Sequence, residues 1–160
     1  MSREPAPAAT SGVKFPPPAF YALGLGAGFL AARWWPVPIW PVHALELRAL
    51  GILGFLLGLG FAGWGVLAFR SVGTSPNPMR PTTSLAFGGP YRFSRNPMYL
   101  GLAVASASFA LFWNALWPLL SVPVAMALVW RFVIAREERY LAAKFGEEYL
   151  RYRGRVRRWI

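Results

Sequence analysis

Four long apolar segments decide what this chain can fold into. They cover residues 19–35, 47–69, 98–113 and 115–135. A helix needs about 20 apolar residues to cross a bilayer. The second and fourth segments reach that length, and Trp side chains at the interface can extend the first and third. The sequence therefore predicts an all-α integral membrane bundle of four transmembrane helices, followed by a cytoplasmic C-terminal helical segment.

The composition agrees with a membrane protein. Hydrophobic residues make up 56% of the chain and charged residues only 14%, which is more apolar than usual for soluble domains. The net charge is +11, but the basic residues lie between and after the apolar segments. We therefore expect membrane lipids, and not nucleic acid, as partners. The chain has no Cys and one His, His43, so we also expect no metal site.

The distribution of basic residues predicts the orientation in the membrane. The N-terminal residues, the loop at 70–97 and the end of the chain from Arg131 together hold fifteen Lys and Arg, against two in the loop after the first segment. The positive-inside rule places both termini in the cytoplasm. We expect a multi-pass protein of a prokaryotic inner membrane, with a flexible tail at 1–18 and one domain at 19–160.

The loop sequence "GPYRFSRNPMYLG" at 89–101 combines prolines, tyrosines and two arginines beside an apolar helix. Its prolines and glycines predict a defined irregular loop, and Pro97 suits the first turn of the third helix. A helix N-terminus next to Arg92 and Arg95 favours an anionic group. Contact of the two arginines with lipid phosphate is the alternative interpretation.

The segment after the fourth span carries most of the acidic residues. Glu137 and Glu138 lie next to the membrane, where an uncompensated charge is costly. They either approach the surrounding arginines or bind something cationic. Gly146 is a natural helix stop. We expect this segment and the loop to share one face and form one site. Its carboxylates, arginines and tyrosines match S-adenosylmethionine, as one ligand among several.

Two glycine-rich stretches lie inside the apolar segments rather than after strands. They are "GLGAGF" at 24–29 and the pair Gly54 and Gly58. Within hydrophobic helices, such spacing predicts close helix packing and not nucleotide binding.

Several of these motifs occur together in a known family. The chain has Gly-Pro-Tyr-Arg at 89–92, Arg-Asn-Pro-Met-Tyr-Leu-Gly at 95–101, Glu-Glu-Arg-Tyr-Leu at 137–141, Phe-Gly at 145–146, and paired tyrosines. Over about residues 73–156 it resembles the isoprenylcysteine carboxyl methyltransferases, which are similar to membrane phosphatidylethanolamine methyltransferases. The usual His of that family is Asn96 here, and Asn cannot titrate near neutral pH.

The resemblance implies S-adenosyl-L-methionine as cofactor, with S-adenosyl-L-homocysteine as product, and a lipophilic methyl acceptor. It implies a cofactor site built from about 73–101 and 131–156. Arg95 and Glu138 are the implied catalytic residues. The implied cofactor-binding residues are Gly89, Pro90, Tyr91, Arg92, Asn96, Pro97, Tyr99, Glu137, Glu138, Tyr149, Tyr152 and Arg153.

Carboxyl O-methylation is the first expected activity, and phospholipid N-methylation is the alternative. A carboxylate acceptor needs no base, and Arg95 could position it. An amine must lose a proton, which a Glu of raised pKa could accept. A third hypothesis is a non-catalytic membrane protein whose basic tail binds anionic lipid. That binding would depend on salt but not on Glu138 or Tyr91.

Overall fold

A computed structural model describes residues 10–40 and 45–160, so residues 1–9 and His43 lie outside the described residues. The described chain is helical and holds no strand. The prediction of an all-α fold is confirmed, because a helix covers each predicted apolar segment. The elements are α1 (Pro17–Trp34), α2 (Leu45–Ser71), the 3₁₀ turn η1 (Gly89–Arg92), α3 (Pro97–Phe112), α4 (Leu116–Val129), the π-helical turn η2 (Trp130–Ile134) and α5 (Ala135–Arg155).

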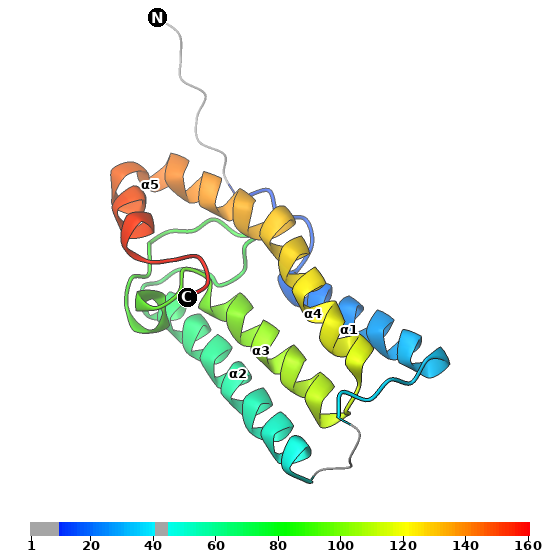
Figure 1. Cartoon of the computed structure of the whole chain (residues 1–160). Coiled ribbons are helices and arrows are strands. Elements are labelled where there is room, and N and C mark those ends of the chain that lie inside the picture. Colours follow the sequence, from blue (N-terminus) through cyan, green and yellow to red (C-terminus); the bar gives the residue numbers. More distant parts are fainter. Residues whose placement is uncertain (1–9, 41–44) are drawn as a thin grey trace, which may run out of the picture.

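The helices pack as two neighbouring pairs (Figure 1). Helix α2 lies along α3, and α1 lies along α4, while α3 and α4 join the pairs. The loop between α2 and α3, helix α5 and the C-terminus gather at one end of the bundle. Two sequence segments that were predicted to share one face therefore do lie together.

Within the described residues, two helical stretches are long and apolar enough to cross a membrane, namely Leu45–Ser71 and the run of successive helices Leu116–Arg155. Helix α3 is apolar but shorter. Large apolar side chains of α2 face outward, and Leu53 and Leu57 are 54% and 62% exposed. The apolar part of the longer helix ends at Ile134, because α5 holds ten charged residues among its 21. Helix α5 therefore continues beyond the apolar part of the bundle.

Glycines bring helix backbones into direct contact. A Cβ atom on Gly58 of α2 would lie 2.6 Å from the backbone nitrogen of Ala105 on α3. A Cβ atom on Gly101 of α3 would lie 2.5 Å from the carbonyl oxygen of Gly58. In α1, a Cβ atom on Gly28 would lie 2.5 Å from the Cα atom of Pro118. The prediction of a helix-packing role is confirmed for Gly28, which belongs to the stretch 24–29, and for Gly58.

The chain ahead of α1 lies against the protein from residue 11 onward. Ser11 Oγ donates a 2.6 Å hydrogen bond to the Pro78 carbonyl, and Arg136 donates a 2.8 Å bond to the Gly12 carbonyl. Val13 is 6% exposed. The predicted tail at 1–18 thus includes residues that are held by hydrogen bonds and apolar burial, and α1 already begins at Pro17.

Gly146 interrupts α5 with φ +50° and ψ −128°, as expected for a helix stop. The last part of the helix consequently changes direction and runs back toward the loop (Figure 1). This turn brings Tyr149 and Tyr152 to the bundle, where Tyr149 is buried.

We predict that Gly58→Ala destabilises the protein by about 1–3 kcal/mol, because backbone atoms of α3 occupy the space of the added methyl group. Gly60→Ala on the same helix is the matched control, since nothing lies within 4 Å of its added Cβ. It should leave stability unchanged or raise it by up to ~1 kcal/mol. Thermal unfolding in detergent measures both variants. Equal effects of the two substitutions would contradict the packing assignment.

Candidate functional site

A cavity opens at the end of the bundle where the loop, the start of α3 and α5 meet. Eight residues from the predicted set line it, and they come from all three segments. They are Tyr91, Arg95, Asn96, Tyr99, Glu137, Glu138, Tyr149 and Tyr152. The fold therefore places residues that are up to 61 positions apart in the sequence around one cavity. Tyr152 and Tyr91, which are the farthest apart of the eight, are also joined by a hydrogen bond from the Tyr152 hydroxyl to the Tyr91 carbonyl.

The other five predicted residues lie outside the cavity lining. Gly89 and Pro90 form the η1 turn, where Gly89 has φ +59° and approaches the ring of Trp64. Pro97 is buried in the first turn of α3. Arg92 and Arg153 are exposed. These motif residues shape the backbone or face outward, so a direct contact with a ligand in this cavity remains a prediction for them.

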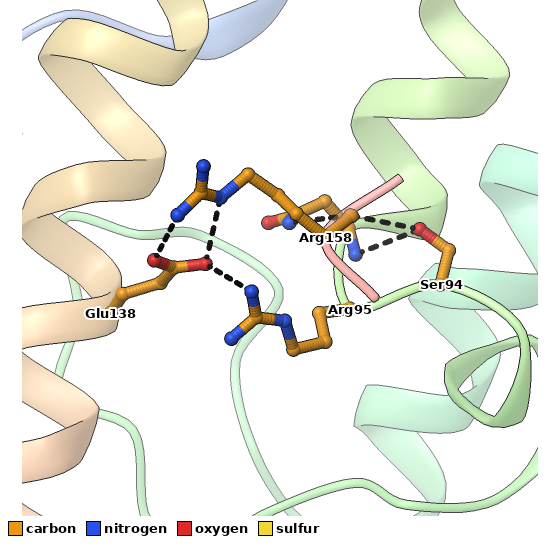
Figure 2. Close-up of polar contacts among 5 residues, drawn as sticks. Ser94, Arg95, Glu138 and Arg158 are labelled. Atoms are coloured by element: carbon orange, nitrogen blue, oxygen red, sulfur yellow. Dashed lines mark hydrogen bonds and ion pairs between the residues drawn. The ribbon is translucent and has the colours of Figure 1, made fainter. Parts of the chain in front are cut away.

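Glu138 lies between two arginines (Figure 2). Arg158 contacts both of its carboxylate oxygens, with Nε–Oε1 at 3.1 Å and Nη2–Oε2 at 2.9 Å. Arg95 contacts one oxygen, with Nη2–Oε1 at 3.1 Å. The side chains of Arg95 and Glu138 are 10% and 12% exposed. The charge of Glu138 is thus compensated inside the protein, as a buried carboxylate requires.

Glu137 has a different environment from its neighbour. Tyr99 Oη donates to its carboxylate at 3.0 and 3.1 Å, whereas both ion pairs of the described residues belong to Glu138. Burial raises the pKa of Glu137, the Tyr99 hydrogen bond lowers it and the charge of Glu138 raises it, and together these effects bring the pKa to about 7. Glu137 therefore changes charge near neutral pH.

Within the part of the chain that the structure describes, three buried polar atoms of the cavity have no hydrogen-bond partner. They are Tyr91 Oη and the Nε and Nη1 atoms of Arg95. Buried polar groups are normally hydrogen-bonded. Burial also raises the pKa of Tyr91 well above its ordinary value, so its hydroxyl stays a donor. These atoms give the cavity free donors for an anionic or hydroxyl-bearing ligand.

Aromatic rings provide the flat part of the cavity wall. Phe69 and Tyr91 have ring centroids 5.0 Å apart, and Tyr149 and Tyr152 are 6.3 Å apart. Tyr91 and Tyr149 are only 3% and 2% exposed. Buried rings of this kind suit a planar, partly apolar ligand group.

The C-terminal residues are attached to the loop by three hydrogen bonds. Ser94 Oγ and Asn96 Nδ2 donate to the Arg158 carbonyl at 3.2 and 3.0 Å, and the Arg95 backbone nitrogen donates to the Arg157 carbonyl at 3.0 Å. Asn96, at the position of the family's usual His, therefore contacts the chain end in addition to lining the cavity.

Several cavity residues were not singled out by sequence reasoning. Ser11 and Phe69 lie outside the predicted site ranges, whereas Thr82, Met98, Tyr140 and the stretch 75–78 lie within them but were not named individually. Arg158 was missed as well. It follows the last matching motif, and the sequence does not distinguish it from the other arginines near it. Only the prolines at 76 and 78 gave a signal, as they predict a defined loop. Within the described residues, no group of three or more His, Cys, Asp or Glu side chains could hold a metal ion.

Comparison with known proteins decides the family. The chain matches the family model described as phospholipid methyltransferase over residues 47–148, which is 102 of 160 residues. The chain belongs to this family. The matched range includes the loop, α3 and the two neighbouring glutamates. The resemblance to isoprenylcysteine and phospholipid methyltransferases is thereby confirmed.

Two relatives support the assignment. The methanethiol S-methyltransferase 1 of Bradyrhizobium diazoefficiens is 34% identical over 150 residues, covering 78% of this chain and 46% of that protein. The chain thus spans about half the length of this relative. An uncharacterized protein of Haemophilus influenzae is 41% identical over 63 residues, covering 39% of this chain and all of that protein. No solved structure matches the chain.

The family membership favours a membrane methyltransferase over a non-catalytic lipid-binding protein. Methyltransferases of this kind use S-adenosylmethionine, which is the cofactor that the motifs imply. The apolar helices and the family together indicate membrane association.

Proposed function

We propose that the protein transfers a methyl group from S-adenosylmethionine to a lipophilic acceptor in the cavity described above. One observation carries this proposal. Among the described residues, two side-chain nitrogen atoms of Arg95 have no hydrogen-bond partner, and the carboxylate of Glu137 forms no ion pair with an arginine. Both side chains line the same cavity. A ligand that carries both a carboxylate and a cation would satisfy both groups, as the amino-acid part of the cofactor does.

Different residues of the cavity would bind different parts of the cofactor. When bound, S-adenosylmethionine supplies a methyl group on a positively charged sulfur. Arg95 would hold its carboxylate, Glu137 would compensate its positive charge, and Tyr91 and Tyr149 would contact its adenine ring. Glu138 was the first expectation for polar contacts to the cofactor. Because arginines already bind both of its oxygens, Glu137 takes this role in our proposal.

The proposed cofactor site keeps the boundaries 73–101 and 131–156 and extends them to Arg158. Residues 19–160 then form one methyltransferase domain. Most of the site lies on α5 and the loop, outside the apolar part of the helices. The apolar helices would present a lipophilic acceptor, so the donor and acceptor would meet where the two environments join.

For the acceptor atom, a carboxylate oxygen remains our first candidate. It is ionised at neutral pH and needs no base. In this proposal Glu138 binds the arginines and Glu137 compensates the positive charge of the cofactor, so neither is required as a base. A thiol is the second candidate, supported by the 34% identity to a protein named methanethiol S-methyltransferase 1. A phospholipid amine is the third, supported by the family description. A thiol or amine must lose a proton, and Glu137 would then be the proton acceptor.

Binding of S-adenosylhomocysteine to the detergent-purified protein tests the cofactor. We expect saturable one-to-one binding by calorimetry and much weaker binding of adenosine, which lacks the amino-acid part. Transfer of labelled methyl from S-adenosylmethionine to a prenylated cysteine, a small thiol and phosphatidylethanolamine then identifies the acceptor. A folded sample that does not bind S-adenosylhomocysteine would overturn the proposal.

We predict that Glu137→Gln lowers the affinity for S-adenosylhomocysteine about tenfold at pH 8, because a charged hydrogen bond is lost. The wild-type affinity should fall as the pH drops below about 7, where Glu137 becomes protonated. The variant should lose this pH dependence. Unchanged affinity with slower methyl transfer would instead assign Glu137 as the proton acceptor for a thiol or amine.

We further propose four membrane spans with the cavity end in the cytoplasm of a prokaryotic inner membrane, as the basic residues predict. The chain contains no Cys, so single cysteines can be labelled cleanly. In intact cells, a membrane-impermeant maleimide should label Pro38→Cys between α1 and α2. It should label Phe93→Cys, at an exposed loop position, only after permeabilisation. The reverse pattern would invert the orientation.

A further inference from the structure

Two arginines compete for one carboxylate in the cavity wall. Arg158 binds both oxygens of Glu138 and therefore occupies the carboxylate in the two-pronged geometry that arginine prefers. Arg95 makes a single contact with Glu138, from Nη2 to Oε1 at 3.1 Å (Figure 2). Its Nε and Nη1 atoms remain buried and without a partner.

This arrangement prevents Arg95 from forming a second hydrogen bond with Glu138. A buried N–H group without a partner is unfavourable, so Arg95 would gain from closing onto Glu138 with two hydrogen bonds. The Glu138 Oε2 atom is the acceptor it would need, and Arg158 Nη2 occupies that atom at 2.9 Å. The contact made by Arg158 thus leaves the donors of Arg95 available to the cavity.

Arg158 is held in this position independently of Glu138. Its carbonyl oxygen accepts hydrogen bonds from Ser94 Oγ and Asn96 Nδ2. Its guanidinium carbon also lies 5.7 Å from the ring centroid of Trp130, within the range of a cation–π contact. Ser94 and Asn96, the residues on either side of Arg95, therefore fix the backbone of Arg158.

We propose that Arg158 is a positioning residue, which occupies Glu138 so that the guanidinium of Arg95 stays open toward a carboxylate ligand in the cavity. The inference rests on the proposed function, because that ligand is taken to be the cofactor's amino-acid carboxylate. It assigns a role to the C-terminal residues, which lie outside the motifs of the family resemblance.

The proposal predicts different effects on the binding of the amino-acid part and of the adenosine part of the cofactor. Without Arg158, Arg95 closes onto Glu138 and no longer offers its Nε and Nη1 atoms to a carboxylate. Binding of the adenosine part, which would depend on the aromatic wall, should change little. A general loosening of the site would weaken the binding of both parts.

The test uses calorimetry of the full chain with S-adenosylhomocysteine and with 5′-methylthioadenosine, which lacks the amino-acid group. We expect Arg158→Gln to lower the affinity for S-adenosylhomocysteine about tenfold, the value of a charged hydrogen bond. Its affinity for 5′-methylthioadenosine should stay within about twofold. Arg157→Gln is the matched control, because its side chain is exposed and its carbonyl contact to Arg95 is retained.

A double variant tests the competition itself. Adding Glu138→Gln to Arg158→Gln removes the carboxylate that captures Arg95, so the affinity for S-adenosylhomocysteine should rise again above that of Arg158→Gln. If Arg158→Gln binds S-adenosylhomocysteine as the wild type does, or weakens both ligands equally, or is not improved by Glu138→Gln, the positioning role is wrong. Wild-type protein that binds neither ligand would overturn the proposed function, and this inference with it.

Discussion

The carboxylate of Glu138 beside the apolar bundle is the constraint on which the cavity end of this molecule depends. A buried charge of this kind is tolerated only with partners. Its two partners come from distant parts of the chain, Arg95 from the loop and Arg158 from the C-terminal residues. Compensating one charge therefore joins α5, the loop and the chain end. The cavity lies among these joined segments, so its wall is fixed by the same contacts that stabilise the fold.

Helix packing determines how precisely these segments meet. The backbones of α2 and α3 are in contact at Gly58 and Gly101. This contact fixes the position of α3 along α2, and with it the position of the loop that precedes α3. Two residues before Gly101, the hydroxyl of Tyr99 donates a hydrogen bond to Glu137 on α5. The Tyr99 carbonyl accepts a hydrogen bond from Tyr21 of α1. A small-residue contact in the apolar part thus positions a polar contact in the cavity.

Most of the fold was predictable from the sequence, because apolar segment lengths, glycine spacing and the helix stop at Gly146 are local signals. Eight residues of the predicted site line the cavity for a related reason, since the charge distribution already placed both segments on one face. Which glutamate meets the arginines was not predictable. Glu137 and Glu138 are adjacent, and only their tertiary contacts distinguish them, with Tyr99 of α3 for Glu137 and with two arginines for Glu138. Arg158 escaped prediction because three hydrogen bonds to the loop, and no local pattern, distinguish the chain end there from its neighbours.

The two adjacent glutamates show how one helix can serve structure and ligand at the same position. Glu138 is tied to two arginines, so its charge is part of the fold. Glu137 has one tyrosine partner and a pKa raised to about 7 by burial. At neutral pH its charge therefore responds to its surroundings, because a cation in the cavity favours the ionised form and releases a proton. Environments that differ this much between neighbours are typical of functional sites. They favour Glu137, and not Glu138, as the group that meets a cationic ligand.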